Sequence, residues 1–437
     1  MKKGFIVFTV ILGCLLISVH GRGELSEFPL VSGENDQESP SIYSNIVIWR
    51  EERDGTWGTY GRDLSTQREF HVTVEGRELS NPKIYGTIVV GTASDTGYQH
   101  VYGYDLSTGE GFRMSTVESN KPMLDFFGTL AVWEDDRHGS WDIYGYDVST
   151  RKEFRITDED AQQWQPAVYG DIVVWVDDRE DTHIYGYNVS TGEEFQITTD
   201  DADPFSPAIY GDIVVWVDMR NFDLVYKNWE LYGYDLSTQE EFRITMGISN
   251  PSCPEIYGDS VVWNDDRHGN WELYGYDLST RKEFRITTDE VEQFTHELWG
   301  SMVVWSDDRN GNYDIYGRDL GNDCRRFVRQ EGDFFLEKGK NKCEEEEYES
   351  ALFLLQLAKQ NYLYAEAAEK AEECDEWIQK CHREPEGICG GSLLLVAVLG
   401  VLGLRREREK ERERTPEQGD MLGTTPMRRD TDSRRDE

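Results

Sequence analysis

An apolar pattern of about 42 residues recurs seven times between residues 41 and 327. In one complete copy, short apolar runs at 166–169 and 172–176 are followed by a Tyr-Gly-Tyr segment at 185–187 and by 193–198. These runs are rich in β-branched and aromatic residues, and Gly, Asp, Asn and Ser separate them, as turns require. Four short strands in each of seven repeats predict an all-β chain, folded as a seven-bladed β-propeller of four-stranded blades over residues 24–330.

After the seventh repeat the apolar spacing changes to that of helices. Residues 344–359 and 362–381 predict two antiparallel helices, with a short helix at 333–341 before them. Together they predict a small α-helical hairpin over residues 331–383, which resembles a single tetratricopeptide unit. One such unit cannot bury a core alone, so we expect it to dock on the propeller or to serve as a stalk.

Two more apolar segments lie at the ends of the chain. Lys2 and Lys3 precede an apolar run, which predicts a secretory signal peptide over residues 1–21; a retained anchor and a lipid-modified Cys14 are the alternatives. After a linker at 384–389, the apolar residues 390–404 end at Arg405 and Arg406. Basic residues on that side predict a transmembrane segment, with 405–437 as a charged, disordered cytoplasmic tail. We therefore expect an extracellular protein on the cell surface, anchored to the membrane by its C-terminal segment.

The net charge narrows the choice of partner. The chain carries 85 acidic and 45 basic side chains, for a formal charge of −40. This sign argues against nucleic acid as a partner, because a surface that binds phosphates is basic. Aromatic residues make up 12% of the chain, so it is not a disordered acidic sequence.

Two local motifs carry resemblances to known families. The run from Asp307 to Tyr316, Asp-Asp-Arg-Asn-Gly-Asn-Tyr-Asp-Ile-Tyr, resembles the repeat of TolB-type (WD40-like) propellers. That resemblance implies a propeller fold and a binding scaffold, a peptidase gate or a lyase as its function. The segment from Cys389-Gly390-Gly391 to Arg406 resembles the Cys-Gly-Pro sorting tail of archaeal surface proteins, with Gly391 where the proline stands. It implies that the tail is processed, whereas a plain membrane anchor is the alternative.

Two segments compete to close the propeller ring. Residues 27–32 resemble the outer strand of a blade but precede the first repeat, so they could pair with the last blade. Residues 326–328 could occupy the same edge.

Residues that recur from blade to blade are interpreted as structural, because a catalytic site is normally built once. The repeated Trp residues predict core positions between blades. The repeated Asp-Arg dipeptides predict charge pairs that hold hairpins. These dipeptides are Asp136-Arg137, Asp178-Arg179, Asp266-Arg267 and Asp308-Arg309.

Function should lie where the repeats differ. The loops between the second and third strands, and those leading into each inner strand, share one face of a propeller. On that face the sequence gathers acidic and aromatic residues, which predict an acidic funnel suited to cations, cationic peptides or sugar rings. A merely solvated acidic rim is the alternative. The candidate ligand-binding residues are Asp160, Trp164, Asp203, Phe205, Glu292, Phe294 and, in a longer loop of the fifth copy, Phe222 and Tyr226.

The second copy departs from the others, because Gly91 replaces its Trp. It predicts either a weakened blade or an opening for a ligand. Signs of catalysis are few, since neither a Gly-x-Ser-x-Gly elbow nor a His-Glu-x-x-His run occurs. A histidine metal site of the lyase kind is the remaining enzymatic alternative.

Outside the cell, cysteines favour disulfides. The candidates are Cys324, Cys343, Cys374 and Cys381. Cys374 and Cys381 lie two turns apart on one helix, so each is expected to pair with Cys324 or Cys343, leaving Cys253 free. A zinc site is the alternative.

These features together predict a surface-displayed propeller without a cofactor or metal, acting as a binding scaffold for a protein, peptide or glycan on its acidic loop face. A propeller enzyme, a peptidase-associated module or a structural component of the cell envelope are the alternatives.

Overall fold

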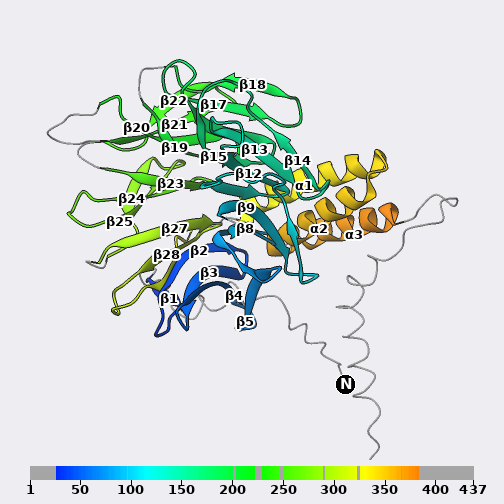
Figure 1. The fold of residues 1–437 in the computed structure, drawn as a ribbon, viewed down its shortest axis with the longest axis horizontal. Coiled ribbons are helices and arrows are strands. Elements are labelled where there is room, and N and C mark those ends of the chain that lie inside the picture. Colours follow the sequence, from blue (N-terminus) through cyan, green and yellow to red (C-terminus); the bar gives the residue numbers. More distant parts are fainter. Residues whose placement is uncertain are drawn as a thin grey trace, which may run out of the picture. The chain divides into compact units, whose positions relative to one another are not determined.

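The computed structural model describes residues 26–95, 97–199, 203–221, 229–246, 250–288, 291–321, 325–365 and 367–382. These residues form a β-propeller followed by three helices (Figure 1). The predicted signal peptide, the apolar segment 390–404, the sorting motif and the cytoplasmic tail lie outside the described residues. Within the described part, no helix combines the length and the apolar character needed to cross a membrane.

The propeller has seven antiparallel sheets, one for each repeat, which confirms the predicted fold. The inner strands contact one another in order around the central axis, and the last contacts the first. They are β2 (Gln37–Tyr43), β7 (Ser80–Tyr85), β11 (Leu124–Phe127), β15 (Gln163–Tyr169), β19 (Phe205–Tyr210), β23 (Ser252–Tyr257) and β27 (Gln293–Trp299).

The second and third strands of each blade continue outward from the inner strand. The second strands are β3 (Ile46–Arg53), β8 (Ile88–Asp95), β12 (Leu130–Asp135), β16 (Ile172–Asp177), β20 (Ile213–Asp218), β24 (Ser260–Asp265) and β28 (Met302–Asp307). The third strands are β4 (Thr56–Asp63), β9 (Tyr98–Asp105), β13 (Asp142–Asp147), β17 (His183–Asn188), β21 (Glu230–Asp235), β25 (Glu272–Asp277) and β29 (Asp314–Asp319).

Six outer strands follow their own blade along the chain. They are β5 (Arg68–Val74), β10 (Glu110–Arg113), β14 (Lys152–Arg155), β18 (Glu193–Gln196), β22 (Glu240–Arg243) and β26 (Lys282–Arg285). The first blade adds a fifth strand, β6 (Arg77–Glu78), so its sheet is one strand wider than predicted. The repeated glycine of the third strand leaves room for the outer-strand Phe: a Cβ on Gly233 would lie 2.5 Å from the Phe242 ring.

The N-terminal strand closes the ring. Strand β1 (Phe28–Val31) pairs antiparallel with β29, joining Phe28 to Gly317 and Val31 to Ile315. It therefore supplies the outer strand of the seventh blade. The competing residues 326–328 lie in a helix instead.

Three helices follow the propeller, where the sequence predicted a hairpin of two helices with a short helix before it. They are α1 (Arg325–Glu344), α2 (Tyr348–Tyr364) and α3 (Ala368–Cys381). The expected short helix at 333–341 is the middle of the 20-residue α1. Val328, Phe335 and Leu336 are buried in the same core as the propeller residues, so the length of α1 follows from tertiary packing that a local pattern underestimates.

The helices dock on one face of the propeller. Leu357 lies against Gly86 and Phe335 against Gly128, both in turns between a first and a second strand. Ser350 Oγ donates to the carbonyl of Ser149, in a turn between a third and a fourth strand, at 3.1 Å. We call this side the turn face and the opposite side, with its longer connections, the loop face. The three helices form a helical cap on the turn face (Figure 1).

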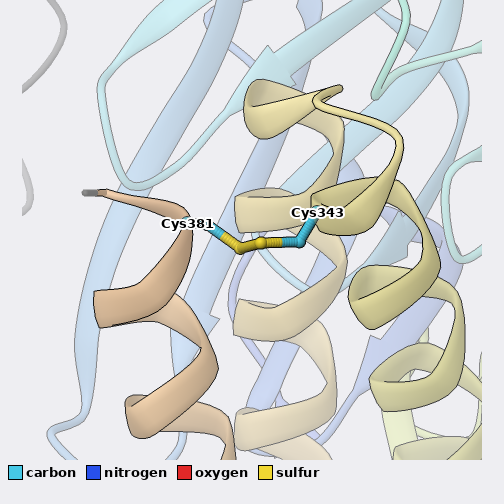
Figure 2. The surroundings of a disulfide bond; sticks show 2 residues. All are labelled: Cys343 and Cys381. Carbon is cyan, nitrogen blue, oxygen red and sulfur yellow. A yellow bond between two sulfur atoms is a disulfide. The ribbon is translucent and has the colours of Figure 1, made fainter. Parts of the chain in front are cut away.

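One disulfide joins the end of α1 to the end of α3. Cys343 and Cys381 are bonded, with Cα atoms 5.7 Å apart (Figure 2). Cys374 is free and buried, which corrects the expectation that it pairs. It lies two turns before Cys381 and faces the helical core, whereas the ends of α1 and α3 meet. Cys253 is free, as predicted, and Cys324 lies outside the described residues.

Candidate binding site

The charged residues that recur in the blades form structural braces. In the fourth blade, the Trp175 indole donates to Asp177 at 3.0 Å, and Arg179 pairs with Asp177 at 2.7 Å. The Arg179 guanidinium lies over the Tyr185 ring, 4.1 Å from its centre, and reaches Glu194 of the outer strand at 2.7 Å. Related clusters occur around Trp49, Trp133, Trp216, Trp263 and Trp305. These Trp side chains are fully buried, so their predicted core role is confirmed.

The structure corrects the partner of each arginine. The sequence predicted the adjacent acids Asp136, Asp178, Asp266 and Asp308. The arginines pair instead with Asp135, Asp177, Asp265 and Asp307. Successive residues of a strand point to opposite sides of the sheet, so the Trp, Asp and Arg side chains can contact one another only when they are two residues apart in the sequence. The second acid has a different role: Asp178 accepts the backbone N–H of Gln162 at 2.6 Å, bracing a loop on the loop face.

Three predicted aromatic residues lie near the entry of inner strands, on the loop face. Trp164 and Phe205 are half-buried and Phe294 is exposed. They occupy matching positions, paired with Val176, Val217 and Ser306 of their second strands. Phe205 packs edge-to-face against Trp229, with their ring centres 5.3 Å apart. Phe294 packs in the same way against Tyr313, with ring centres 5.8 Å apart.

The predicted acids also lie on this face, in the connections before those strands. Asp160, Asp203 and Glu292 are exposed. The predicted contacts Phe222 and Tyr226 lie outside the described residues. The structure thus places the described candidates on a common face, and whether they bind a ligand stays a prediction.

Exposed apolar side chains on the loop face add to this set. Six large hydrophobic residues are exposed within the described ranges, and all but Leu363 of α2 belong to the loop face. The five on the loop face are Tyr98, Val117, Met123, Met246 and Phe294. Sequence reasoning identified only Phe294, because a single apolar residue in a loop gives no periodic signal.

The central channel is closed on the turn-face side by a ring of aromatic side chains. The last residues of the seven inner strands form this ring, with neighbouring ring centres 4.4–5.9 Å apart. They are Tyr43, Tyr85, Phe127, Tyr169, Tyr210, Tyr257 and Trp299. We call this the aromatic floor. Glu331 of α1 contacts the aromatic floor from the side of the helical cap. It accepts hydrogen bonds from the Tyr85 hydroxyl at 2.7 Å and from the Tyr210 hydroxyl at 3.0 Å.

A charged cluster lines the channel above the aromatic floor. Each member of this cluster lies on an inner strand, two residues before the aromatic-floor residue of that strand. The members are Lys83, Asp125, Glu255 and Glu297. They border a cavity of about 200 Å³ whose wall also includes the floor residues. Lys83 forms an ion pair with Glu297 across the channel and lies 3.9 Å from Glu255. One cation thus faces three carboxyl groups, which leaves the cluster short of positive charge.

The electrostatics of this cluster follow from its enclosure. Burial raises the pKa of Glu255 to about 8; Lys83 opposes this shift, and Glu297 and Asp125 add to it. Burial would lower the pKa of Lys83, but Glu297 and Glu255 raise it above its ordinary value. Lys83 is therefore charged at neutral pH, while Glu255 is largely protonated and would ionise if a second cation approached.

The channel is open toward the loop face. Six inner strands contain a residue with positive φ four positions before the aromatic floor. A bulge or register irregularity accompanies it. Among these residues, Asn81, Cys253 and Thr295 are exposed at the channel mouth, next to the exposed Met123 of the third blade. His296 is buried behind them; burial lowers its pKa to about 4.

In the second blade, Leu79 occupies the space beside Gly91, where the other blades have Trp. The four strands of this blade are complete, and a Cβ on Gly91 would lie 2.9 Å from Leu79 Cβ. His100 is buried there and hydrogen-bonds to Arg113 at 2.8 Å. Whether this copy is weakened or opens for a ligand stays a prediction. Across the described ranges, no three His, Cys, Asp or Glu side chains are grouped as a metal site would need.

Comparisons with known proteins agree with this fold. No protein-family model matches the chain, and no curated protein matches its sequence. The propeller domain of the trilobed protease from Pyrococcus furiosus is 13% identical over 68% of this chain and 95% of its own, with a TM-score of 0.53.

Two further solved structures are similar to parts of this chain. Oligogalacturonate lyase from Vibrio parahaemolyticus is 13% identical, covering 69% of this chain and 95% of the lyase, with a TM-score of 0.54. TolB from Acinetobacter baumannii is 18% identical over 58% of this chain and 64% of its own, with a TM-score of 0.40. At 13% identity, the likeness to the protease domain and to the lyase concerns the fold alone.

Proposed function

We propose that this chain is a non-enzymatic binding propeller whose loop face engages a protein or peptide partner. The observation that carries the proposal is the asymmetry between the two faces. The helical cap covers the turn face and the end of the channel, whereas the loop face carries five exposed large hydrophobic residues and the exposed acids Asp160, Asp203 and Glu292.

The chemistry of this face favours a basic partner segment. Asp160, Asp203 and Glu292 give its rim negative charge, and the channel holds three carboxyl groups against Lys83. A lysine or arginine side chain could enter the channel, where carboxylates and aromatic rings both attract cations. Tyr98, Met123 and Phe294 supply exposed apolar contact area on the same face.

Closure of the channel also bears on the enzymatic alternative. The aromatic floor and Glu331 obstruct a path along the propeller axis, which disfavours a gate that would pass a peptide through the centre of the ring. For a lyase of the metal-dependent kind, the described residues lack a grouped set of ligands. Binding is therefore the function that the geometry favours.

The location of the protein is part of the same proposal. A secretory signal at residues 1–21 and an apolar segment at 390–404 would display the propeller on the cell surface, with the latter as the anchor. Protease treatment of intact cells tests this display: fragments of the propeller should be released without lysis.

A peptide and glycan array tests the binding function directly. The full chain should bind basic peptides, and binding should weaken with salt because the attraction is electrostatic. The double variant Trp164→Ala and Phe294→Ala should lose at least tenfold in affinity. Leu363→Ala is the matched control, because Leu363 is an exposed hydrophobic residue on the helical cap.

Three outcomes would contradict the proposal. They are preferential binding of acidic peptides, equal losses in the loop-face variant and in Leu363→Ala, or turnover of a peptide or polysaccharide without stable binding. Selective binding of a neutral glycan would retain the scaffold but reject the basic partner.

A further inference from the structure

Glu331 is a buried acid at the point where the helical cap meets the propeller axis. Its side chain is 1% exposed. Tyr85 and Tyr210 donate to its two carboxylate oxygens, and Asn361 Nδ2 of α2 lies 3.3 Å from Oε2. Asn361 also accepts a hydrogen bond from Tyr43 at 2.5 Å. One carboxyl group thus links two cap helices to several blades.

The groups that face Glu331 are neutral. Five floor tyrosines from separate blades have pKa values raised by burial and by the charge of Glu331: Tyr43, Tyr85, Tyr169, Tyr210 and Tyr257. On the cap side, the facing polar group is Asn361. In the part of the chain that the structure describes, no Lys or Arg forms an ion pair with Glu331. A negative charge at this point therefore has hydrogen bonds but no counterion.

We propose that Glu331 is a pH-sensitive latch, which holds the helical cap on the aromatic floor when protonated and weakens this contact when ionised. The protonated carboxyl group carries no charge, and a neighbouring tyrosine hydroxyl oxygen can accept its proton, so it can stay buried. The ionised group must be kept out of water in a mainly aromatic setting, so undocking, which returns it to water, becomes easier.

The direction of the pH effect follows from linkage. Burial raises the pKa of docked Glu331 to about 7, with hydrogen bonds from Tyr85, other tyrosines and Asn361 acting in the opposite direction. In an undocked cap the pKa would return to about 4.5. Docking is therefore strongest below pH 4.5, is lost progressively up to pH 7, and is weakest above it. The difference corresponds to a rise of about 300-fold in the undocking equilibrium.

Undocking would change the channel. Tyr85, Tyr210 and Trp299 belong both to the wall of the cavity and to the floor that the cap contacts. Release of Glu331 and Asn361 would remove the support of that floor from below. The latch would thereby make the channel, and the loop-face site above it, responsive to the pH outside the cell.

Hydrogen exchange on the full chain tests the latch. Protection of amides in α1 and α2, corrected for the intrinsic effect of pH, should fall by one to two orders of magnitude between pH 5.5 and 8.5. Blade-core amides serve as the internal reference and should change far less. Glu331→Gln should abolish the pH dependence, because the amide is nearly isosteric and stays neutral. Glu337→Gln is the matched control, since Glu337 is exposed on the same helix.

A second variant keeps the test decisive if Glu331→Gln folds poorly. Tyr210→Phe removes one donor to the carboxylate, so the midpoint of the pH transition should move upward. The proposal is overturned if cap protection is the same at both pH values or if Glu331→Gln keeps the wild-type pH dependence. An equal loss of protection in the blade core, or an unchanged midpoint in Tyr210→Phe, would likewise overturn it.

Discussion

The arginine brace gives a sharp test of which acid in each Asp-Asp-Arg triplet supports the fold. Asp177 is fully buried and accepts hydrogen bonds from the Trp175 indole and from the Arg179 backbone and guanidinium. Asp178, the next residue, is exposed and accepts one hydrogen bond from the backbone of Gln162. We expect Asp177→Ala to be far more destabilising than Asp178→Ala.

The magnitude follows from the groups left behind. Removing one partner of a buried ion pair costs about 3–5 kcal/mol, because the other charge and any buried donor lose their acceptor. Arg179 keeps Glu194 at 2.7 Å and part of its side chain reaches solvent, which lowers the cost. We therefore expect about 3 kcal/mol for Asp177→Ala, against about 1 kcal/mol for Asp178→Ala, which loses a single exposed hydrogen bond.

Thermal unfolding followed by tryptophan fluorescence measures both variants. Asp177→Ala should lower Tm by about 4 °C and Asp178→Ala by about 1–2 °C. Asp177→Asn separates charge from hydrogen bonding: it should fall between wild type and Asp177→Ala, because an amide oxygen can still accept from Trp175. A larger loss of stability in Asp178→Ala than in Asp177→Ala would refute the assignment of the brace to the first acid.

Two further predictions concern ring closure and the disulfide. Deleting residues 26–31 removes β1 and leaves Arg309 without Glu27, with which it forms an ion pair at 2.8 Å. Because the edge of β29 is then exposed, Tm should fall and the protein should self-associate on size-exclusion chromatography. An unchanged elution volume and Tm would contradict closure of the ring by β1. Peptide mapping without reduction should find a Cys343–Cys381 disulfide and a Cys374 thiol that reacts only after unfolding. The Cys343→Ser variant should destabilise the cap by up to about 4 kcal/mol, as expected for a closed loop of 38 residues. A disulfide that includes Cys374 would contradict this pairing.

Local patterns predicted the blades well because each blade repeats the same short-range rules. Alternating apolar residues and Gly- or Asn-containing turns specify each hairpin, and seven copies leave one closed arrangement. The helical cap was predicted less well. The sequence indicated only a short helix at 333–341 before the hairpin. Helix α1 instead runs from Arg325 to Glu344, because its apolar residues pack on the propeller rather than on a neighbouring helix alone.

The candidate site was predicted in part, for a related reason. Trp164, Phe205 and Phe294 stand out because they break a repeated pattern, and strand order alone places them on one face. Lys83, Asp125, Glu255 and Glu297 do not stand out. They come from four different blades, and no spacing along the chain shows that they line one cavity.

The sequence by itself determined the number of blades, the turn positions and the face that carries the unusual loops, since these depend on residues close together along the chain. The tertiary structure decided which strand closes the ring, which acid each arginine holds, and where the helices dock. It also placed Glu331 beneath an aromatic floor built from seven blades. These features arise from contacts between residues separated by up to 318 positions, as with Tyr43 and Asn361, and only closure of the ring brings such residues together.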